Sequence, residues 1–122
     1  MIRLLATAIL LLPLPALADH FDVIQLQLKE GCSVTQYVAI MKDFNDDWAK
    51  KYGYSAELAV PLQSDDLATV VWVGRSANAG AFGQAWDVWR DASADPESLP
   101  AKLQARFDAC AVEKARRSYD IY

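Results

Sequence analysis

Apolar residues change their spacing within one stretch of the chain, residues 68–89, which reads ATVVWVGRSANAGAFGQAWDVW. The first half contains the continuous apolar run VVWV, which is typical of a buried strand. The second half spaces Phe82, Trp86 and Trp89 along one side of a helix. The pattern therefore predicts a buried strand that leads directly into an amphipathic helix over 78–92.

Alternating apolar residues predict three further strands. These cover 21–28, 57–62 and 118–122, and the last of them is a short edge strand. Pro61 lies in the second of these segments. Because proline cannot donate a hydrogen bond to a neighbouring strand, its presence indicates that this strand lies at an edge of the sheet.

Two further helices are predicted around these strands. A capping box formed by Ser33 and Gln36 opens the first, which is expected to end near Gly53. The other runs from Leu99 to near Arg117. The expected buried stripes are Val34, Val38, Met41, Phe44 and Trp48 on the first, and Leu99, Leu103, Phe107, Cys110 and Ala111 on the other.

The order of these elements is β-α-β-β-α-α-β, which predicts an α+β fold. It corresponds to a ferredoxin-like βαββαβ sandwich with an antiparallel sheet and an extra helix before the last strand. In this plan the end of the first strand, with Cys32, lies close to the start of the last strand, just after Cys110. We therefore expect a disulfide between Cys32 and Cys110, the two cysteines of the chain.

The N-terminus has the three parts of a secretory signal peptide. A short basic segment precedes the apolar run 4–12, two prolines interrupt that run, and Ala16-Leu17-Ala18 forms a cleavage site. The sequence thus predicts a signal peptide over 1–18 and a single domain over 19–122. We expect the mature protein to be periplasmic or extracellular and to carry no membrane anchor.

The charge balance is acidic, with a formal net charge of −4 at pH 7. Loss of Arg3 with the signal peptide makes the mature charge about −5. No basic cluster offsets this charge, which argues against nucleic acids as partners. Two cysteines and one histidine, His20, are too few for a metal site, and no cofactor is expected. His20 is expected to be a frayed residue at the start of the mature chain.

The helices of a ferredoxin-like domain cover only one face of its sheet. The predicted strands also offer apolar residues to the other face, namely Phe21, Val23, Val71 and Val73. Monomeric proteins rarely expose a contiguous apolar patch of this kind. A second copy related by a two-fold axis would cover it, so we expect a homodimer that pairs sheet to sheet.

The order βαββαβ, the helix-opening Asn-Ala after the VVWV strand, and the tryptophan-rich second helix resemble the dimeric α+β barrel superfamily. That superfamily includes antibiotic-biosynthesis-monooxygenase-like, EthD-like and NIPSNAP-like domains. The resemblance covers Phe21 to Tyr122 and implies a dimer whose sheets form a barrel. It also implies that the protein is a cofactor-free monooxygenase or isomerase acting on a small apolar substrate, or a haem-binding protein.

Four residues are the candidates for binding a ligand: Tyr54, Trp72, Arg75 and Trp86. The aromatic residues could line a pocket for a flat apolar molecule, although their spacing is also that of ordinary core residues. Arg75 directly follows a strand and could hold a carboxylate or form a solvated ion pair. No catalytic residue is predicted.

The leading hypothesis for function is a non-enzymatic binding or interaction protein that dimerises through its sheet. The alternatives are a cofactor-free oxygenase or isomerase, and haem binding through His20 or Tyr54. An enzyme would place a polar group such as Arg75, Tyr54 or Asp87 inside a cavity. A plain interaction protein would keep these groups outside and fill its interior with tryptophans.

Overall fold

The computed structural model describes residues 18–122, so the predicted signal peptide lies outside the described residues apart from Ala18. Four strands form one antiparallel sheet with the order β2-β3-β1-β4. The strands are β1 (Asp19–Leu28), β2 (Tyr54–Ala59), β3 (Thr69–Ser76) and β4 (Ala111–Ile121). This strand order is that of a ferredoxin-like fold, and the predicted fold class is confirmed.

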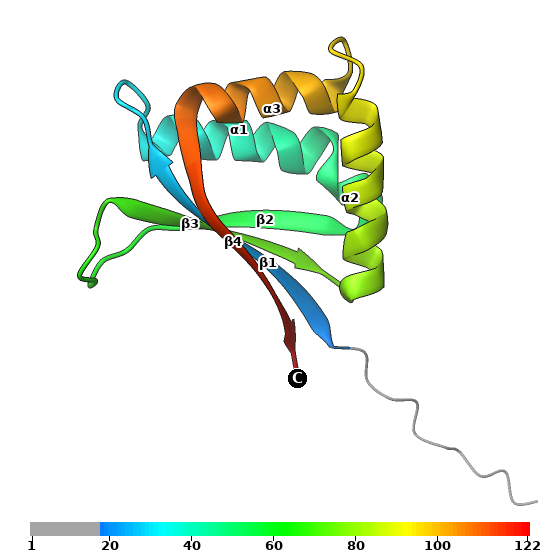
Figure 1. Cartoon of the computed structure of the whole chain (residues 1–122), viewed down its shortest axis with the longest axis horizontal. Coiled ribbons are helices and arrows are strands. Elements are labelled where there is room, and N and C mark those ends of the chain that lie inside the picture. The colour runs from blue at the N-terminus through cyan, green and yellow to red at the C-terminus, as the bar shows by residue number, and fades with distance from the viewer. Residues whose placement is uncertain (1–17) are drawn as a thin grey trace, which may run out of the picture.

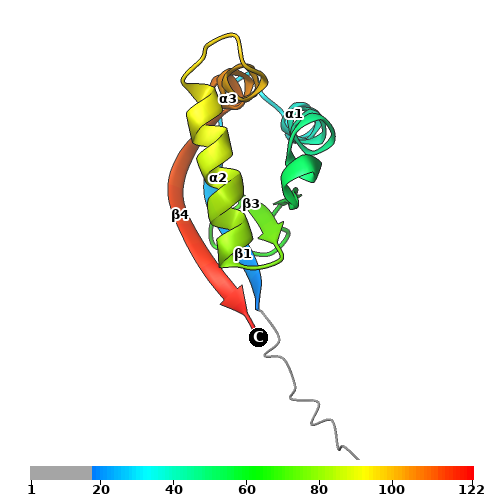
Figure 2. The ribbon, with the colours of Figure 1, turned by 90° about the vertical axis from the view of Figure 1, so that its right-hand side faces the viewer.

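Three α-helices lie on one face of this sheet (Figure 1). They are α1 (Val34–Asp47), α2 (Ala79–Ser93) and α3 (Leu99–Cys110), with a short 3₁₀ helix over Ala49–Tyr52 after α1. Turned by 90°, the molecule shows α1 and α3 end-on, with α2 running down from the level of α3 in front of the sheet (Figure 2). The extra helix predicted before the last strand is α3.

Side chains at the helix starts fix where each helix begins. The capping box is formed in both directions, because Gln36 N donates to Ser33 Oγ (3.2 Å) and Ser33 N donates to Gln36 Oε1 (2.7 Å). Asn78 caps α2 by accepting from Ala81 N at 2.9 Å. Gly53 ends the 3₁₀ helix with a φ of 64°, a left-handed conformation that favours glycine.

The buried stripe of α1 differs from the expected one. Val34 and Val38 are exposed, and Tyr37 and Ile40 are buried in their place. All four are apolar and lie on one broad arc of the helix, so spacing alone does not decide which of them faces the core. Packing against the sheet and α3 decides it, because the aromatic ring of Tyr37 contacts that of Phe107 on α3 with centroids 5.4 Å apart.

The largest correction concerns the end of the chain. The helix expected to run to Arg117 ends at Cys110, and β4 begins at Ala111 and pairs with the whole of β1. All residues of the segment 111–117 except Val112 are alanine, glutamate, lysine or arginine, which favour a helix by intrinsic propensity. Pairing with a central strand overrides that propensity. Arg116 therefore lies on a strand of the sheet.

The second strand also differs from its predicted position. It runs over Tyr54–Ala59 and stops before Pro61, which the prediction placed inside it. Its pairing with β3 runs from Tyr54 opposite Ser76 to Ala59 opposite Val71. The predicted edge position is correct, because β2 has only β3 as a neighbour.

A disulfide joins Cys32 and Cys110, as predicted. Their Cα atoms are 5.3 Å apart, within the usual range for a disulfide, and they lie 78 residues apart in sequence. The bridge ties the loop after β1 to the point where α3 becomes β4. None of the helices within residues 18–122 is long and apolar enough to cross a bilayer.

Removing this bridge is expected to destabilise the fold. The double variant Cys32→Ser/Cys110→Ser should lose up to about 4 kcal/mol of unfolding free energy, because its unfolded chain is no longer held in a long closed loop. Urea unfolding measures this loss. Reduction should produce the same loss in the wild type and none in the variant, whereas equal stability of the two proteins would contradict the prediction.

Candidate functional site

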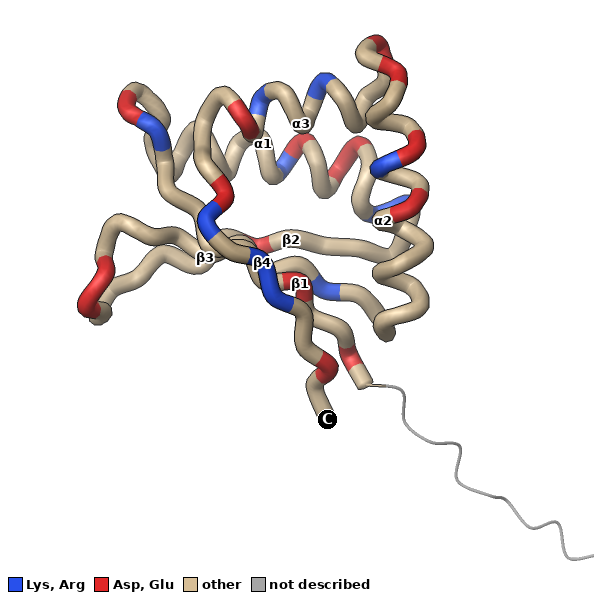
Figure 3. Tube along the Cα trace, in the orientation of Figure 1, with Lys and Arg blue, Asp and Glu red and all other residues tan. Residues whose placement is uncertain are grey.

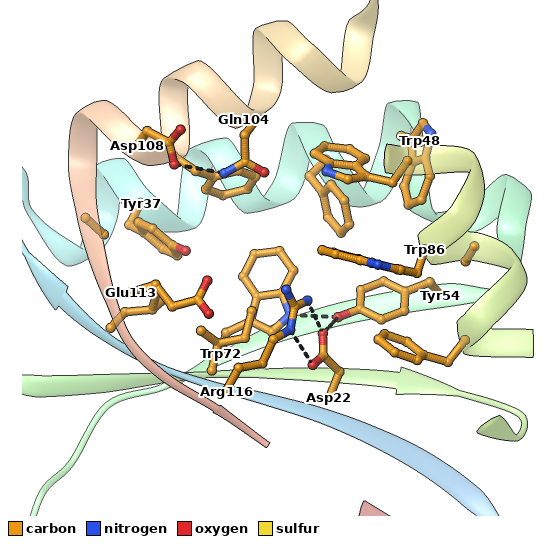
Figure 4. Close-up of a pocket in the computed structure, with 18 residues that line it drawn as sticks. Asp22, Tyr37, Trp48, Tyr54, Trp72, Trp86, Gln104, Asp108, Glu113 and Arg116 are labelled. Carbon is orange, nitrogen blue, oxygen red and sulfur yellow. Dashed lines mark hydrogen bonds and ion pairs between the residues drawn. The ribbon is translucent and has the colours of Figure 1, made fainter. Parts of the chain in front are cut away.

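A cavity of about 290 Å³ lies between the sheet and the helices (Figure 4). Half of the residues that form its wall are aromatic, and all four tryptophans of the chain are among them. Phe44 lies at the centre of this wall, with ring centroids 5.2 Å from Trp72 and 5.3 Å from Trp89. Both contacts are edge-to-face, the arrangement that aromatic pairs favour. The aromatic walls therefore support one another.

One polar part of the cavity is a hydrogen-bonded group that we call the floor network, formed by Asp22, Tyr54, Trp72 and Arg116. Arg116 donates two hydrogen bonds to Asp22, from Nε to Oδ1 at 2.9 Å and from Nη2 to Oδ2 at 2.7 Å. The Tyr54 hydroxyl donates to Asp22 Oδ2 at 3.2 Å and accepts from Trp72 Nε1 at 2.8 Å. Each of the four strands contributes one residue to this network.

Asp22 is almost completely enclosed, with 1% of its surface exposed. A buried carboxylate is costly unless it is paired and hydrogen-bonded, and a bidentate contact with arginine supplies both. Burial lowers the pKa of Arg116, but its hydrogen bonds to Asp22 and the charge of Asp22 outweigh this and raise it overall. Burial and the neighbouring charge of Asp22 raise the pKa of Tyr54, which keeps its phenol neutral.

Gly74 makes room for the network. It lies on β3 directly opposite Asp22 of β1, so Tyr54 must reach across it from β2. A Cβ built on Gly74 would lie 1.7 Å from the Tyr54 hydroxyl oxygen. Any other residue here would therefore push the tyrosine away from Asp22.

The ring of Trp86 stacks on the guanidinium of Arg116. The guanidinium carbon of Arg116 is 4.4 Å from the centroid of the Trp86 ring, a cation–π contact. Trp86 is 40% exposed, whereas Trp72 and Trp89 are buried. Trp86 therefore forms a wall of the cavity that also faces solvent.

Three of the four predicted ligand-binding residues line this cavity, namely Tyr54, Trp72 and Trp86. Arg75 does not, because side chains alternate along β3 and it lies on the opposite face from Trp72. Its guanidinium lies 4.4 Å from the Phe21 ring centroid and 3.6 Å from a Glu57 oxygen.

Asp87 also lies outside the cavity. Its carboxylate pairs with Arg90 at 3.0 Å, and both side chains are about 60% exposed. Of the three polar groups that an enzyme was expected to place inside, only the Tyr54 hydroxyl is there.

Sequence reasoning missed Asp22 and Arg116. Asp22 has the same parity as Ile24 and Leu26 on β1, and a carboxylate on the buried face of a strand is a signal that it needs a buried partner. Arg116 carries no such signal, because the segment around it was predicted to be helical. Basic positions gather on β4, and acidic ones lie close to them (Figure 3).

His20 is buried rather than frayed, which corrects the prediction. It is 7% exposed, its Nδ1 lies 2.8 Å from Asp120 Oδ1, and its ring packs 4.9 Å from that of Phe82. At this position β1 is paired with β3 on one side and with β4 on the other, which holds His20 in place. Ser76 lies opposite His20 on β3. His20 Nε2 and the Ser76 hydroxyl are both buried, and neither has a hydrogen-bond partner among residues 18–122.

Neither predicted haem ligand suits a haem iron. His20 packs against Phe82 and is not among the residues that line the cavity, and the Tyr54 hydroxyl is engaged by Asp22 and Trp72. Within residues 18–122 no three or more His, Cys, Asp or Glu side chains group so that they could hold a metal ion.

Comparison with known proteins identifies the fold. No family model and no curated protein sequence matches the chain. Among solved structures it is similar to SnoaB, a cofactor-independent oxygenase from Streptomyces nogalater. The TM-score is 0.55 at 12% identity, over 86% of this chain and 94% of that one. It is also similar to a conserved protein from Methanosarcina mazei, with a TM-score of 0.59 at 12% identity over 88% and 96% of the two chains.

At these identities the likeness shows the fold alone. These structures bear out the fold that the resemblance implied.

Loss of the arginine in the floor network should be costly. Arg116→Met leaves the buried Asp22 carboxylate without its ion partner, so the free energy of unfolding should fall by about 3 kcal/mol. Arg117→Met is the matched control. Arg117 is exposed and follows Arg116 on the opposite face, so its loss should change stability by no more than about 0.5 kcal/mol. Urea unfolding that gave equal losses would contradict this assignment.

Proposed function

We propose that this protein is an exported binding protein that holds a small flat aromatic molecule in the cavity between its sheet and its helices. The observation that carries the proposal is the floor network, a hydrogen-bonded polar group set among the aromatic rings of the cavity. Cavities of this composition, mostly apolar with a few convergent polar groups, are typical of sites for small molecules.

The size of the cavity limits the ligand. A volume of about 290 Å³ corresponds to the space of about ten water molecules in the liquid, which suits a ligand of one or two fused rings. Aromatic walls favour a flat ring system through stacking and edge contacts. A hydroxyl or carbonyl on that ring system would meet the guanidinium of Arg116 or the Tyr54 hydroxyl at the floor.

Export is part of the proposal. The three-part N-terminal sequence supports it, and so does the Cys32–Cys110 disulfide, since disulfides persist in oxidising compartments. The periplasm and the exterior are both compartments of this kind.

A cofactor-free oxygenase is the second candidate. Its specific support is the nearly enclosed carboxylate of Asp22 beside a guanidinium and a neutral phenol. Such a group could accept a proton from a bound phenol or enol, and the guanidinium would stabilise the resulting anion. SnoaB, which shares the fold, is a cofactor-independent oxygenase.

Titration calorimetry with naphthylethanol tests the binding proposal. We expect a dissociation constant of about 1 mM or tighter, from the size of the probe. Ala85→Leu adds bulk to a buried residue of the cavity wall and should weaken binding about tenfold. Ala92→Leu makes the same change on α2 outside the cavity and should leave binding unchanged. Equal binding by both variants would contradict the assignment, and oxygen uptake with a naphthalenediol would favour the second candidate.

We also propose that the protein is a homodimer. The sheet face opposite the helices carries the partly exposed Phe21, Val23, Val71 and Val73, and no helix within residues 18–122 covers it (Figure 1). Burying this face against a second copy would remove an apolar patch from water. Arg75 and Glu57 lie on the same face and offer both charges for a self-complementary two-fold contact.

Light scattering tests the dimer. The wild-type protein should have twice the mass of one mature chain, and Val73→Glu should make it monomeric by placing a charge in the interface. Val34→Glu makes the same change at an exposed position of α1 and should leave the mass unchanged. A monomeric wild type would contradict the proposed assembly.

A further inference from the structure

The cavity has a second polar end, opposite in character to the floor network. It consists of Tyr37 from α1, Gln104 and Asp108 from α3, and Glu113 from β4. Tyr37 is 3% exposed, yet within residues 18–122 no hydrogen bond engages its hydroxyl. Figure 4 shows this hydroxyl and the Glu113 carboxylate pointing toward the same part of the cavity. We call this group the acidic end.

An irregularity in the sheet brings Glu113 to this place. The pairing of β4 with β1 shifts between Gln25 and Leu26, so that Arg116 lies opposite Ile24 and Glu113 lies opposite Leu26. In a regular strand, residues three positions apart point to opposite faces. The extra residue of the bulge turns both side chains toward the cavity, and bulges that re-aim a side chain in this way are common next to functional sites.

The carboxylates at this end form no ion pair with a cation in the described part of the chain, although the charge of Glu113 contributes to raising the pKa of Arg116. Glu113 forms no ion pair within the described part of the chain, and Asp108 accepts a hydrogen bond only from the neutral amide of Gln104, at 2.8 Å. The Lys29 ammonium donates to the backbone carbonyl of Asp108 and pairs with neither carboxylate. Burial, followed by the charges of Glu113 and Asp108, raises the pKa of Tyr37. Its phenol therefore stays neutral and can donate or accept a hydrogen bond.

Across the whole cavity, three carboxylates face one guanidinium, and that guanidinium is already paired with Asp22. The excess charge is therefore negative and lies at the acidic end. Aromatic rings around it add to the attraction for cations, since the face of an aromatic ring carries partial negative charge. A carboxylate on the ligand would be repelled at this end.

We propose that the acidic end receives a protonated amine, so that the ligand is a flat aromatic molecule carrying an alkylamine. The ring system lies among the tryptophans, and the ammonium group lies between Glu113 and the hydroxyl of Tyr37. This inference rests on the proposed binding function and adds the charge of the ligand to it.

Calorimetric titration with three probes of one skeleton tests the inference. Naphthylethylamine carries a positive charge, naphthylethanol is neutral and naphthylacetate is negative. We expect the amine to bind about tenfold more tightly than the alcohol, and the acid to bind most weakly, as a partly desolvated contact of a cation with a carboxylate and aromatic rings predicts.

Glu113→Gln removes the charge and keeps the shape of the side chain, so it should abolish the preference for the amine over the alcohol. Glu30→Gln, at an exposed turn outside the cavity, changes the net charge equally and should preserve the preference. Equal affinities for amine and alcohol in the wild type, or an unchanged preference in Glu113→Gln, would overturn the inference and leave the binding function intact. Failure of all three probes to bind would instead contradict the binding function, and the inference with it.

Discussion

The arrangement of the site depends on one buried charge, the carboxylate of Asp22. It lies on a central strand, faces the helices and is almost sealed from water, so its charge must be balanced from within the protein. Arg116 reaches it from β4, on one side of β1, and Tyr54 reaches it from β2, beyond β3 on the other side. Gly74 leaves the space through which Tyr54 passes, and Trp72 fixes the tyrosine hydroxyl. The position of this one carboxylate thus links all four strands.

A contribution to stability does not by itself explain the buried ion pair of Asp22 and Arg116. Well-packed apolar residues of similar volume are often as stabilising as a buried ion pair, or more so. In this protein the pair lies in the wall of a cavity, where its hydrogen-bonding groups can meet a ligand. The combination of a rigid aromatic wall and an anchored polar group is the reason why we propose binding, and an enzyme could use the same combination.

Much of the fold could be predicted from the sequence because local signals agree with tertiary packing. The strand over residues 70–73 and the helix that follows it have clear and different periods, and the capping residues mark helix starts. The Cys32–Cys110 bridge followed from the strand order, since the order brings the two positions together. Tyr54, Trp72 and Trp86 line the cavity because large aromatic residues on inward faces must surround whatever space remains.

The floor network was not predictable in the same way. Arg116 reaches Asp22 only if its segment is a strand in one particular register. The local propensities of these residues predict neither that strand nor its bulge. The parity of Asp22 with Ile24 and Leu26 was the signal that could have been used. The prediction that His20 is frayed was wrong for a related reason. Pairing on both sides of β1 orders the start of this strand, which the local sequence did not indicate.

The most direct test of the account is to map a bound aromatic probe by NMR. With naphthylethanol added to the protein, the indole N–H signal of Trp72 and the backbone amides of Asp22 and Ala85 should shift. The amides of Glu30 and Glu57, away from the cavity lining, should not. Shifts confined to the sheet face opposite the helices, around Val71 and Val73, would show that aromatic molecules bind elsewhere and that the cavity is only part of the core.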